Sequence, residues 1–501
     1  SSDEKLMGFP AWENPGRGAL GLSPRDGGGC ARRADGGAPG LEATLRCRAT
    51  GRPRAPGGGA AFLVTNDHHL ALADPAKPAH DRRVITELAI TVQFSKVAAD
   101  HLDVVPSLRT GGVARHPNRV PSREAAVNLP FEEGLKVEQD LFMKLMTGSQ
   151  SAAQRYIFFA QRQVTKIPDI EKDTEIKSIE SVGVIGAGTM GGGISMNFAN
   201  AGIPVTIIEQ NQERLDKGLS IIRKNYENTA AKGRITSEQV EERMNLIDGQ
   251  TTLDCLDTQD LIIEAVFENM DLKKDIFKQL DGICKEGAIL ASNTSALDVN
   301  VIAAETKRPE DVIGLHFFSP ANVMRLLEIV RGEKTSKSVV ASSLAVAKKI
   351  QKIAAVVGVC PGFVGNRILA QRQREANKLI LEGALPWDID DALYDFGFPM
   401  GPFAMSDLAG LDIGWNKETS NGETLRDVLC EAGRLGQKSG KGFYVYDENR
   451  NKSPDPEVEE LIKKFGEERQ IQMRDISKEE ILERCLYPMI NEGFKILEEG
   501  M

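Results

Sequence analysis

The stretch SVGVIGAGTMGGGISMNFANAGIPVTIIE (residues 181–209) decides the fold of this chain. It contains an apolar strand (181–185), then Gly186, Gly188 and Gly191 in the spacing GxGxxG, then a helical segment and a second apolar strand. Glycines at this spacing let the backbone turn sharply and approach a pyrophosphate, which rests on the N-terminus of the following helix. A lone GxGxxG is weak evidence because glycine-rich turns are common. Here the strands and the helix stand where a βαβ unit needs them, so the stretch predicts a dinucleotide-binding turn.

The second strand of this unit ends at Glu209, where a carboxylate can bind the 2′-hydroxyl of a ribose. The next three residues are Gln, Asn and Gln, so no arginine is present there to receive a 2′-phosphate. The sequence therefore predicts NAD rather than NADP as the cofactor. The alternative is a glycine-rich turn in a sheet that binds no nucleotide.

The region around this unit continues the same alternation. Between 181 and 318, helical segments separate the β-rich runs SVGVIG, VTIIE, LIIEAV, AILAS and VIGLHFF. This pattern predicts an α/β fold, a Rossmann-type doubly wound parallel sheet with helices on both faces. From Pro361 to about 435 the apolar periodicity is helical, which predicts an all-α domain after the sheet.

Histidine usage points to one candidate base. The protein has six histidines, and five of them (68, 69, 80, 101 and 116) precede the patterned part of the chain. The sixth, His316, ends the strand VIGLHFF at the sheet edge where ligands bind. The sequence predicts a turn at 319–322 and a returning strand at 324–330, which places Glu328 opposite His316. Cross-strand Cβ atoms lie roughly 5 Å apart, so the carboxylate can orient the imidazole as a general base. The alternative is a structural histidine at a strand end.

Two further segments point to the same edge. The segment Ser292-Asn293-Thr294-Ser295 follows the strand AILA, so its hydroxyls and amide emerge at the same sheet edge, and Asn293 is expected to bind the cofactor. Asn366 lies in CPGFVGNR (360–367), which opens the helical region, and its amide could donate a hydrogen bond to a carbonyl oxygen. Each segment alone would be interpreted as a cap or a turn.

Composition excludes several classes of function. A chain of 501 residues predicts about two to four domains, and a net charge of −10 argues against a nucleic-acid partner. The seven cysteines are dispersed without metal-site spacing, which predicts no metal and a reducing compartment. No apolar run approaches the roughly 20 residues of a membrane span. With neither a secretory signal at the start nor a peroxisomal address at the end, the default expectation is a cytoplasmic protein.

The first 125 residues differ from the rest. Runs such as RDGGGCARRADGGAPG and GRPRAPGGGAAF have no sustained periodicity, although VITELAITVQF (84–94) could form one strand. Gly, Pro, Arg and Ala at this density bury too little apolar surface to offset the entropy of ordering. The sequence therefore predicts a disordered region, or else a stretch that is not an evolved protein sequence, such as an out-of-frame translation.

Seven motifs within 178–447 together resemble the (S)-3-hydroxyacyl-CoA dehydrogenase family of fatty-acid β-oxidation. They are GAGTMG, IIEAVFEN, SNTSAL, GLHFFSPANVMRLLEIV, CPGFVGNRI, FGFPMGPFAMSDLAGLD and GQKSGKGFYVY. The resemblance implies oxidation of an acyl-CoA substrate: His316 takes the hydroxyl proton while C3 delivers hydride to NAD, and Glu328 stabilises the imidazolium. By the same resemblance, Ser295 contacts the substrate hydroxyl and Asn366 binds near the reacting carbonyl.

Two residues of VFENMDLKK, Glu268 and Lys273, match family positions that line the cofactor and CoA cleft. Their alternative interpretation is a solvated helix face. Residues 127–170 further resemble the closing helices of an enoyl-CoA hydratase domain, and LYPMINEGFKILEEG resembles the start of a second helical domain in the fusion enzymes. This implies a bifunctional enzyme with a degenerate hydratase, an intact dehydrogenase and a truncated last domain.

The domain boundaries that follow are 1–125 for the low-complexity region, 126–177 for the hydratase remnant and linker, 178–359 for the NAD-binding domain, 360–447 for the helical domain, 448–475 for a linker and 476–501 for the truncated domain. The alternatives to a dehydrogenase are a bifunctional enzyme that retains hydratase activity and an inactive NAD-binding fragment. In related single-function dehydrogenases the helical domain dimerises, whereas in the fusion enzymes a second helical domain covers the same face. Because that second domain is expected to be truncated here, the face around Phe396, Phe398, Met400, Phe403 and Leu408 is expected to be partly uncovered. We expect it to form a homodimer, or to cause aggregation if the C-terminal helix blocks the correct docking.

Overall fold

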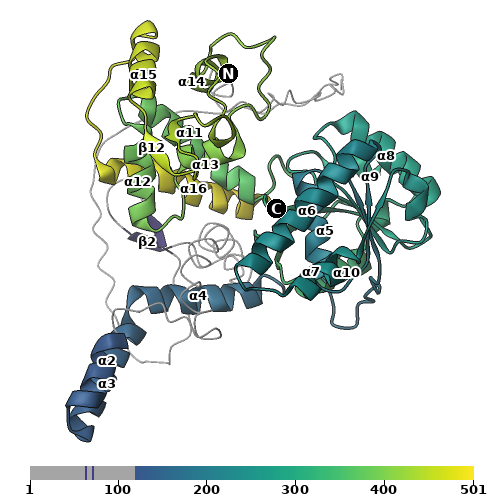
Figure 1. Cartoon of the computed structure of the whole chain (residues 1–501), viewed down its shortest axis with the longest axis horizontal. Helices are drawn as coiled ribbons and strands as arrows, with labels where there is room; N and C mark the ends of the chain where they lie inside the picture. Colours follow the sequence, from purple (N-terminus) through teal and green to yellow (C-terminus); the bar gives the residue numbers. More distant parts are fainter. Residues whose placement is uncertain (1–61, 65–69, 73–118) are drawn as a thin grey trace, which may run out of the picture. The chain divides into compact units, whose positions relative to one another are not determined.

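The computed structural model describes residues 62–64, 70–72 and 119–501, with side chains described from residue 124 onward (Figure 1). Most of the region predicted to be disordered (1–125), and all of the strand predicted at 84–94, lie outside the described residues. β1 (Phe62–Val64) and β2 (Leu70–Leu72) pair antiparallel, with Leu63 opposite Ala71.

An eight-stranded sheet is the centre of the α/β part, in the order β10-β9-β8-β7-β6-β3-β4-β5. All neighbouring strands are parallel except β8 and β9, which form an antiparallel hairpin. β5 and β10, at the two edges, were not among the predicted strands. The strands are β3 (Val182–Ile185), β4 (Val205–Ile208), β5 (Ile247–Gln250), β6 (Leu261–Glu264), β7 (Ile289–Ser292), β8 (Val312–Phe317), β9 (Leu326–Val330) and β10 (Ile353–Val357).

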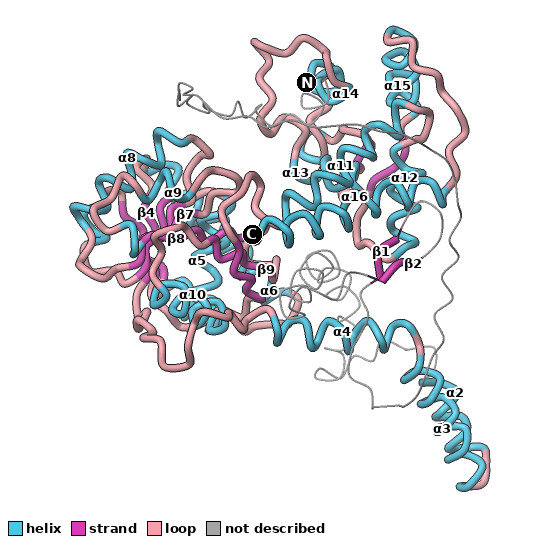
Figure 2. The backbone as a smooth tube through the Cα atoms, turned by 180° about the vertical axis from the view of Figure 1, so that it is seen from behind, coloured by secondary structure: helices cyan, strands magenta, loops and turns pink. Residues whose placement is uncertain are grey.

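Helices cover both faces of this sheet, as predicted (Figures 1 and 2). Buried side chains alternate between the faces: Leu261 and Ile263 join one apolar cluster, and Ile262 joins the other. The first cluster is completed by α5 (Thr189–Asn200), α6 (Gln212–Ala231), α7 (Ser237–Met244) and α10 (Lys337–Lys349). The second is completed by α8 (Met270–Ile283) and α9 (Val299–Ala303), and the short turns η3 (Leu253–Leu256) and η4 (Pro309–Asp311) lie between elements. Burial on both faces explains why the strands are continuous apolar runs.

A helical domain follows, with its own buried core. Proline starts α12 and α13, and Gly397, with φ of 124°, ends α12. The elements are α11 (Gly365–Leu381), α12 (Pro386–Phe396), α13 (Pro402–Ala409), α14 (Leu425–Glu431), η5 (Gln437–Ser439), β11 (Tyr444–Tyr446), β12 (Lys452–Pro454), α15 (Pro456–Glu468) and α16 (Lys478–Glu499).

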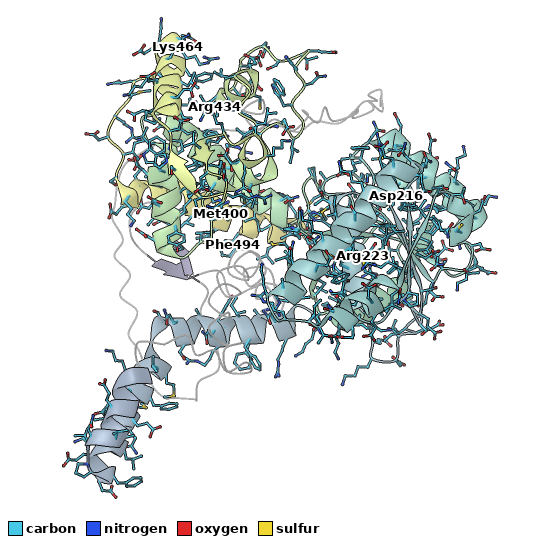
Figure 3. All side chains as sticks on the ribbon, in the orientation of Figure 1. Asp216, Arg223, Met400, Arg434, Lys464 and Phe494 are labelled. Atoms are coloured by element: carbon cyan, nitrogen blue, oxygen red, sulfur yellow. The ribbon has the colours of Figure 1, made fainter. Side chains whose placement is uncertain are left out.

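The segment 448–475, predicted to be a linker, is largely structured and belongs to this domain. α15 lies within it and buries Val458, Ile462 and Phe465 in the helical core. Arg434, labelled in Figure 3, is buried and donates to Asp455 at 2.5 Å and to Glu457 at 2.8 Å, which fixes the start of α15. The sequence interpretation failed because the charged residues around it masked an apolar stripe at helical spacing.

The last helix, α16, was predicted to begin a separate domain, but it packs along α11. Ile481 and Cys485 lie in the core of the helical domain, and Met489 and Ile496 join the second cluster of the sheet. Two members of the face predicted to be uncovered, Phe398 and Phe403, are buried, whereas Phe396 and Leu408 are 48% and 52% exposed.

Three helices precede the sheet: α2 (Arg119–Asn128), α3 (Phe131–Thr147) and α4 (Ser149–Gln163). Leu141, Phe142, Leu145 and Met146 of α3 recur in the sequence at three- and four-residue intervals, a spacing that predicts one buried helix face. That prediction was wrong, because α3 has no buried residue and the Phe142 side chain is 60% exposed. Its substantial contacts within the described chain are with its neighbours α2 and α4, and these do not cover the apolar stripe. None of the helices that the structure describes is long and apolar enough to span a membrane.

Candidate active site

The glycine turn between β3 and α5 leaves space where a ligand would approach. Gly186 has a φ of +105°, and a Cβ on Gly191 would lie 1.8 Å from the carbonyl oxygen of Gly186. These two positions therefore require glycine for the turn itself. A Cβ on Gly188 would meet no protein atom within 4 Å. Gly188 is thus not needed for packing, and the open space in front of it fits a pyrophosphate.

The start of α5 is chemically suited to an anion. In α6, α8 and α10 the side chains of Asn211, Asn269 and Ser336 accept a hydrogen bond from a backbone amide of the first turn. No side chain caps α5, whose N-cap is Gly188. Its first amides are therefore available to an incoming phosphate, and the positive end of the helix dipole favours that charge.

Gly188 and Gly191 provide a matched pair of variants. We expect Gly188→Ala to fold normally but to bind NAD at least about tenfold more weakly, a loss of ~1.4 kcal/mol, because the added methyl group occupies the phosphate approach. Gly191→Ala should instead lower the melting temperature, because overpacking against the Gly186 carbonyl costs about 1–3 kcal/mol. Isothermal titration with NAD and thermal unfolding separate the two effects. Equal NAD affinity in Gly188→Ala and the parent would exclude a phosphate at this turn.

Glu209 follows β4 at the same edge of the sheet. Its backbone amide donates to the Gln250 carbonyl at 3.1 Å, which holds the residue against the neighbouring strand. The side chain is half-buried, and its carboxylate accepts no hydrogen bond from any residue in the described part of the chain. It is therefore available to a ligand hydroxyl.

The pairing of His316 with Glu328 follows the predicted hairpin. The two residues are direct cross-strand partners in the β8–β9 register, and His316 Nδ1 lies 2.7 Å from Glu328 Oε2. The rings of Phe318 and Phe363 lie 4.3 and 5.7 Å from the imidazole, between ring centroids. His316 is 4% exposed and Glu328 is fully buried, so the pair is held in an apolar, largely dry environment.

The other oxygen of Glu328 is held by the helical domain. Glu328 Oε1 accepts hydrogen bonds from the backbone amides of Val364, at 3.2 Å, and Gly365, at 2.7 Å, where α11 begins. An ionised carboxylate only accepts hydrogen bonds, so Nδ1 of the imidazole carries the proton in this pair. That tautomer leaves the lone pair on Nε2, which is the atom that can accept a proton from a substrate hydroxyl.

A second acidic group, Glu268, organises the segment after β7. Glu268 Oε1 accepts hydrogen bonds from the Thr294 hydroxyl at 2.7 Å and from the Ser295 amide and hydroxyl at 2.7 and 3.0 Å. Burial would raise the pKa of Glu268, but Lys273, 3.3 Å away, and these hydrogen bonds hold it below its usual value. Glu268 is therefore ionised at neutral pH and fixes the position of Ser295.

Lys273 is not on a solvated helix face, because only 1% of its side chain is exposed. Its ammonium lies 2.7 Å from Glu264 Oε1, and Glu264 Oε2 accepts a hydrogen bond from Ser292 at 2.7 Å. Glu264 and Ser292 end β6 and β7, and sequence reasoning missed Glu264. A carboxylate closing the apolar run LIIE was the available signal, because a charge is buried there only with a partner.

The two predicted asparagines have different surroundings. Asn293 Oδ1 accepts the amide of Phe317 at 2.8 Å, so this side chain fixes the end of β8 next to His316. Asn366, in the first turn of α11, makes a long contact from Nδ2 to the Ser295 carbonyl, at 3.5 Å. Hydrogen bonds thus link Asn366, Ser295 and Glu268 at the same edge of the sheet as His316. Within the described chain, no three His, Cys, Asp or Glu side chains come together as a metal site.

Comparison with known proteins assigns both parts of the chain. Residues 181–360 match the NAD-binding domain of 3-hydroxyacyl-CoA dehydrogenase, and residues 362–446 match the C-terminal domain of the same family. A peroxisomal bifunctional enzyme from Cavia porcellus is 43% identical over 408 residues, which cover 76% of this chain and 56% of the relative. The chain therefore spans little more than half the length of this curated relative.

Two solved structures are also similar. The dehydrogenase part of a multifunctional enzyme from C. elegans is 33% identical with a TM-score of 0.52, and the match covers 67% of this chain and 78% of that one. An (S)-3-hydroxybutyryl-CoA dehydrogenase from Ralstonia eutropha is 37% identical with a TM-score of 0.50, and the match covers 54% of this chain and all of that one.

Proposed function

Because this chain belongs to the 3-hydroxyacyl-CoA dehydrogenase family, we propose that it oxidises the 3-hydroxyl of (S)-3-hydroxyacyl-CoA thioesters with NAD. The observation that supports this most is the buried His316–Glu328 pair, in which Nε2 of the imidazole is left to act. The pair lies on strands β8 and β9 of the sheet that also contains β3. The glycine turn after β3 leads to the uncapped start of α5, which fits a pyrophosphate.

In the proposed mechanism, His316 Nε2 accepts the hydroxyl proton as the carbon–oxygen double bond forms at C3. Bound NAD supplies the acceptor for the hydride that leaves C3. The positive charge that develops on the imidazole is stabilised by Glu328 through Nδ1, and two backbone amides hold this carboxylate in place. The carboxylate needs no reorganisation when the charge appears, which favours the transition state.

The remaining predicted residues take supporting roles in this proposal. Ser295 contacts the substrate hydroxyl, and Glu268 and Lys273 hold the segment that carries it. Asn366 binds near the reacting carbonyl, and Asn293 keeps His316 at the cofactor side of the sheet by bonding to Phe317. Gly186, Gly188, Gly191 and Glu209 form the NAD site.

NADH formation from 3-hydroxybutyryl-CoA tests the proposal directly. We expect turnover with the full chain and NAD, and none when 3-hydroxybutyrate replaces the thioester. Crotonyl-CoA hydration without NAD is the parallel assay for the bifunctional alternative, since relatives are named bifunctional enzymes. Hydration without any NADH formation would overturn the assignment in favour of a hydratase. A folded protein that binds NAD but gives neither activity would favour the inactive fragment.

Cofactor choice should depend on Glu209. Two unit charges about 4 Å apart repel by roughly 4 kcal/mol at the effective dielectric of ~20 near a protein surface, so a carboxylate at the ribose disfavours a 2′-phosphate. We expect the parent to use NAD far better than NADP, and Glu209→Ala to narrow the ratio of kcat/KM values at least about tenfold. Asp248→Ala, on the neighbouring strand β5, is the control. An unchanged ratio in Glu209→Ala would mean that the carboxylate does not face the ribose.

We further propose a homodimer through the helical domain, residues 361–435. Its exposed apolar side chains include Tyr394, Phe396, Leu408 and Ile413, and apolar surface of this kind commonly marks an interface. Sedimentation at micromolar concentration should give the mass of two chains. Leu408→Glu should shift the mass to one chain, whereas Ile221→Glu, an exposed position on α6, should not. A monomer at all concentrations would show that no such interface forms.

The compartment that we propose is the peroxisome rather than the cytoplasm, which was the default expectation from the sequence. Relatives are named peroxisomal or glyoxysomal enzymes of fatty-acid β-oxidation, which supports this placement. Staining the source cells with an antibody against residues 181–360 should give peroxisomal puncta, and diffuse staining would restore the cytoplasmic assignment.

A further inference from the structure

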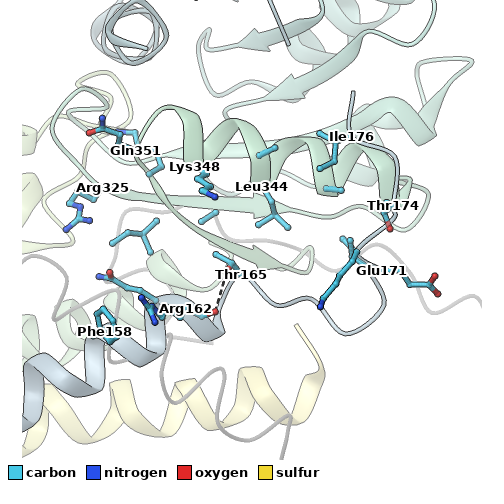
Figure 4. Close-up of a pocket in the computed structure, with 18 residues that line it drawn as sticks. Phe158, Arg162, Thr165, Glu171, Thr174, Ile176, Arg325, Leu344, Lys348 and Gln351 are labelled. Atoms are coloured by element: carbon cyan, nitrogen blue, oxygen red, sulfur yellow. Dashed lines mark hydrogen bonds between the residues drawn. The ribbon is translucent and has the colours of Figure 1, made fainter. Parts of the chain in front are cut away.

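A cavity of about 790 Å³ lies on the α10 side of the α/β part, away from the residues assigned to catalysis. Its walls come from the end of α4, the segment 165–176, one face of α10 and the start of β10. Figure 4 shows Phe158 and Arg162 on one side and Leu344 and Lys348 on the other. Cavities that hold small ligands usually measure about 300–1,000 Å³, so its size suits one.

The charged residues that line this cavity are mostly cations. They are Arg162, Lys172, Arg325, Lys348 and Lys352, against a single carboxylate, Glu171. In Figure 4 the Glu171 side chain extends away from Arg325 and Lys348. Arg325 and Lys348 form no ion pair with any residue in the described part of the chain. Cations gathered without counter-charges are a site of positive potential.

One of these cations, Lys352, is held in a fixed position. Its ammonium donates to the backbone carbonyls of Ala321 and Met324, at 2.5 and 2.6 Å, so it is fixed at the cavity wall. Burial, and secondarily the charge of Arg325, lower the pKa of Lys352 to about 8. An anion in the cavity would offset the repulsion between Lys352 and Arg325, and the attraction of both cations would stabilise the bound anion.

Most of the rest of the wall is apolar, apart from the polar residues Gln161, Thr165, Thr174 and Gln351. Phe158 and Ile176 are 49% and 57% exposed, and Ile170, Leu344 and Ala345 continue the surface. An inorganic anion would leave this surface in contact with water, and a neutral apolar ligand would leave the cations unpaired. A molecule with an anionic head and an aliphatic tail satisfies both parts.

We propose that this cavity is a second ligand site, which binds a phosphate-bearing amphiphile: an aliphatic chain lies against Phe158, Ile176 and Leu344, and a phosphate head group lies among Arg325, Lys348 and Arg162. Two sources have this chemistry, an acyl-CoA thioester and a simple alkyl phosphate. The inference does not rest on the oxidation proposed above, because it concerns binding at residues that take no part in that reaction.

Isothermal titration of the full chain with octanoyl-CoA, octyl phosphate, octanoate and inorganic phosphate tests this site. Octanoyl-CoA has no 3-hydroxyl, so it is not turned over. The variant is Arg325→Glu/Lys348→Glu, and the matched control is Lys349→Glu, because Lys349 is the exposed neighbour of Lys348 on α10 but does not line the cavity. Both positions of the double variant are exposed, and a melting curve checks that it remains folded.

We expect octyl phosphate to bind the parent and Lys349→Glu equally, and the double variant at least about tenfold more weakly, since reversing two charges at the head group removes attraction and adds repulsion. With octanoyl-CoA, the variant should lose one binding event while NADH formation from 3-hydroxybutyryl-CoA is unchanged. Binding of octanoyl-CoA at this site without octyl phosphate would identify the CoA thioester as the ligand. The proposal would be overturned if octanoate bound as tightly as octyl phosphate, if octyl phosphate bound the double variant as tightly as the parent, or if no probe bound.

Discussion

Replacing Glu328 with Gln should lower kcat for 3-hydroxybutyryl-CoA oxidation by about 10⁴-fold in a protein that still folds. A glutamine oxygen can accept the amides of Val364 and Gly365, as Oε1 does now, so its NH₂ group then faces His316 Nδ1. An NH₂ group only donates, so Nδ1 would become the acceptor and the ring proton would move to Nε2. The imidazole would be held in the tautomer that cannot accept the substrate proton, and losses of about 10⁴ follow such a change in acid–histidine pairs.

Steady-state kinetics, NAD affinity and melting temperature together check this result. NAD affinity should be unchanged, because Glu328 does not face the glycine turn. Glu328→Asp is the control variant. It keeps the negative charge but shortens the reach to the backbone amides of Val364 and Gly365, and it should retain more activity than Glu328→Gln. A Glu328→Gln enzyme within tenfold of the parent would show that the carboxylate does not set the tautomer of His316.

His316→Gln should reduce turnover by about 10²–10⁴-fold with NAD binding nearly intact, the usual contribution of a positioned proton acceptor. Of the protein's six histidines, His316 alone lies beyond residue 116, so no other imidazole of the two matched domains can replace it. The double variant His316→Gln/Glu328→Gln should be no slower than the slower single variant, because the two side chains act as one unit. If His316→Gln retained activity within a few-fold of the parent, or if the losses in kcat of the two single variants were fully additive in the double variant, His316 would not be the proton acceptor that Glu328 orients.

The features that could be predicted from sequence are those with a local cause. The glycine turn needs only its own spacing and its flanking strands, and the His316–Glu328 pairing follows from one short hairpin. Contacts between different elements were missed. The Glu264–Lys273 pair joins the end of β6 to the first turn of α8. The apolar run LIIE indicates that the carboxylate is buried, but nothing in the sequence indicates that Lys273 is its partner.

Two other predictions failed because apolar periodicity does not show what an element packs against. The stripe on α3 has helical spacing, yet its side chains are exposed, since no element in the described part of the chain lies over them. α15 carries a similar stripe among charged residues, and it is buried because Arg434 and the helical core lie beneath it. The pattern predicted a helix at α3 but only a linker at α15, and in neither segment did it show burial, which depends on the partner.

Because the start of α11 donates hydrogen bonds to Glu328, both matched domains contribute to the position of one acid–base pair. The carboxylate stands on the sheet, whereas the amides that orient it open the first helix of the following domain. A hinge motion between the sheet and the helices would therefore move Glu328 out of position, and so change the orientation of His316, before it disturbed either fold. The imidazole donates its Nδ1 proton to Glu328, and the two amides hold this carboxylate in position only when α11 is seated against the sheet. An excised α/β domain would keep the nucleotide turn and lose the chemistry.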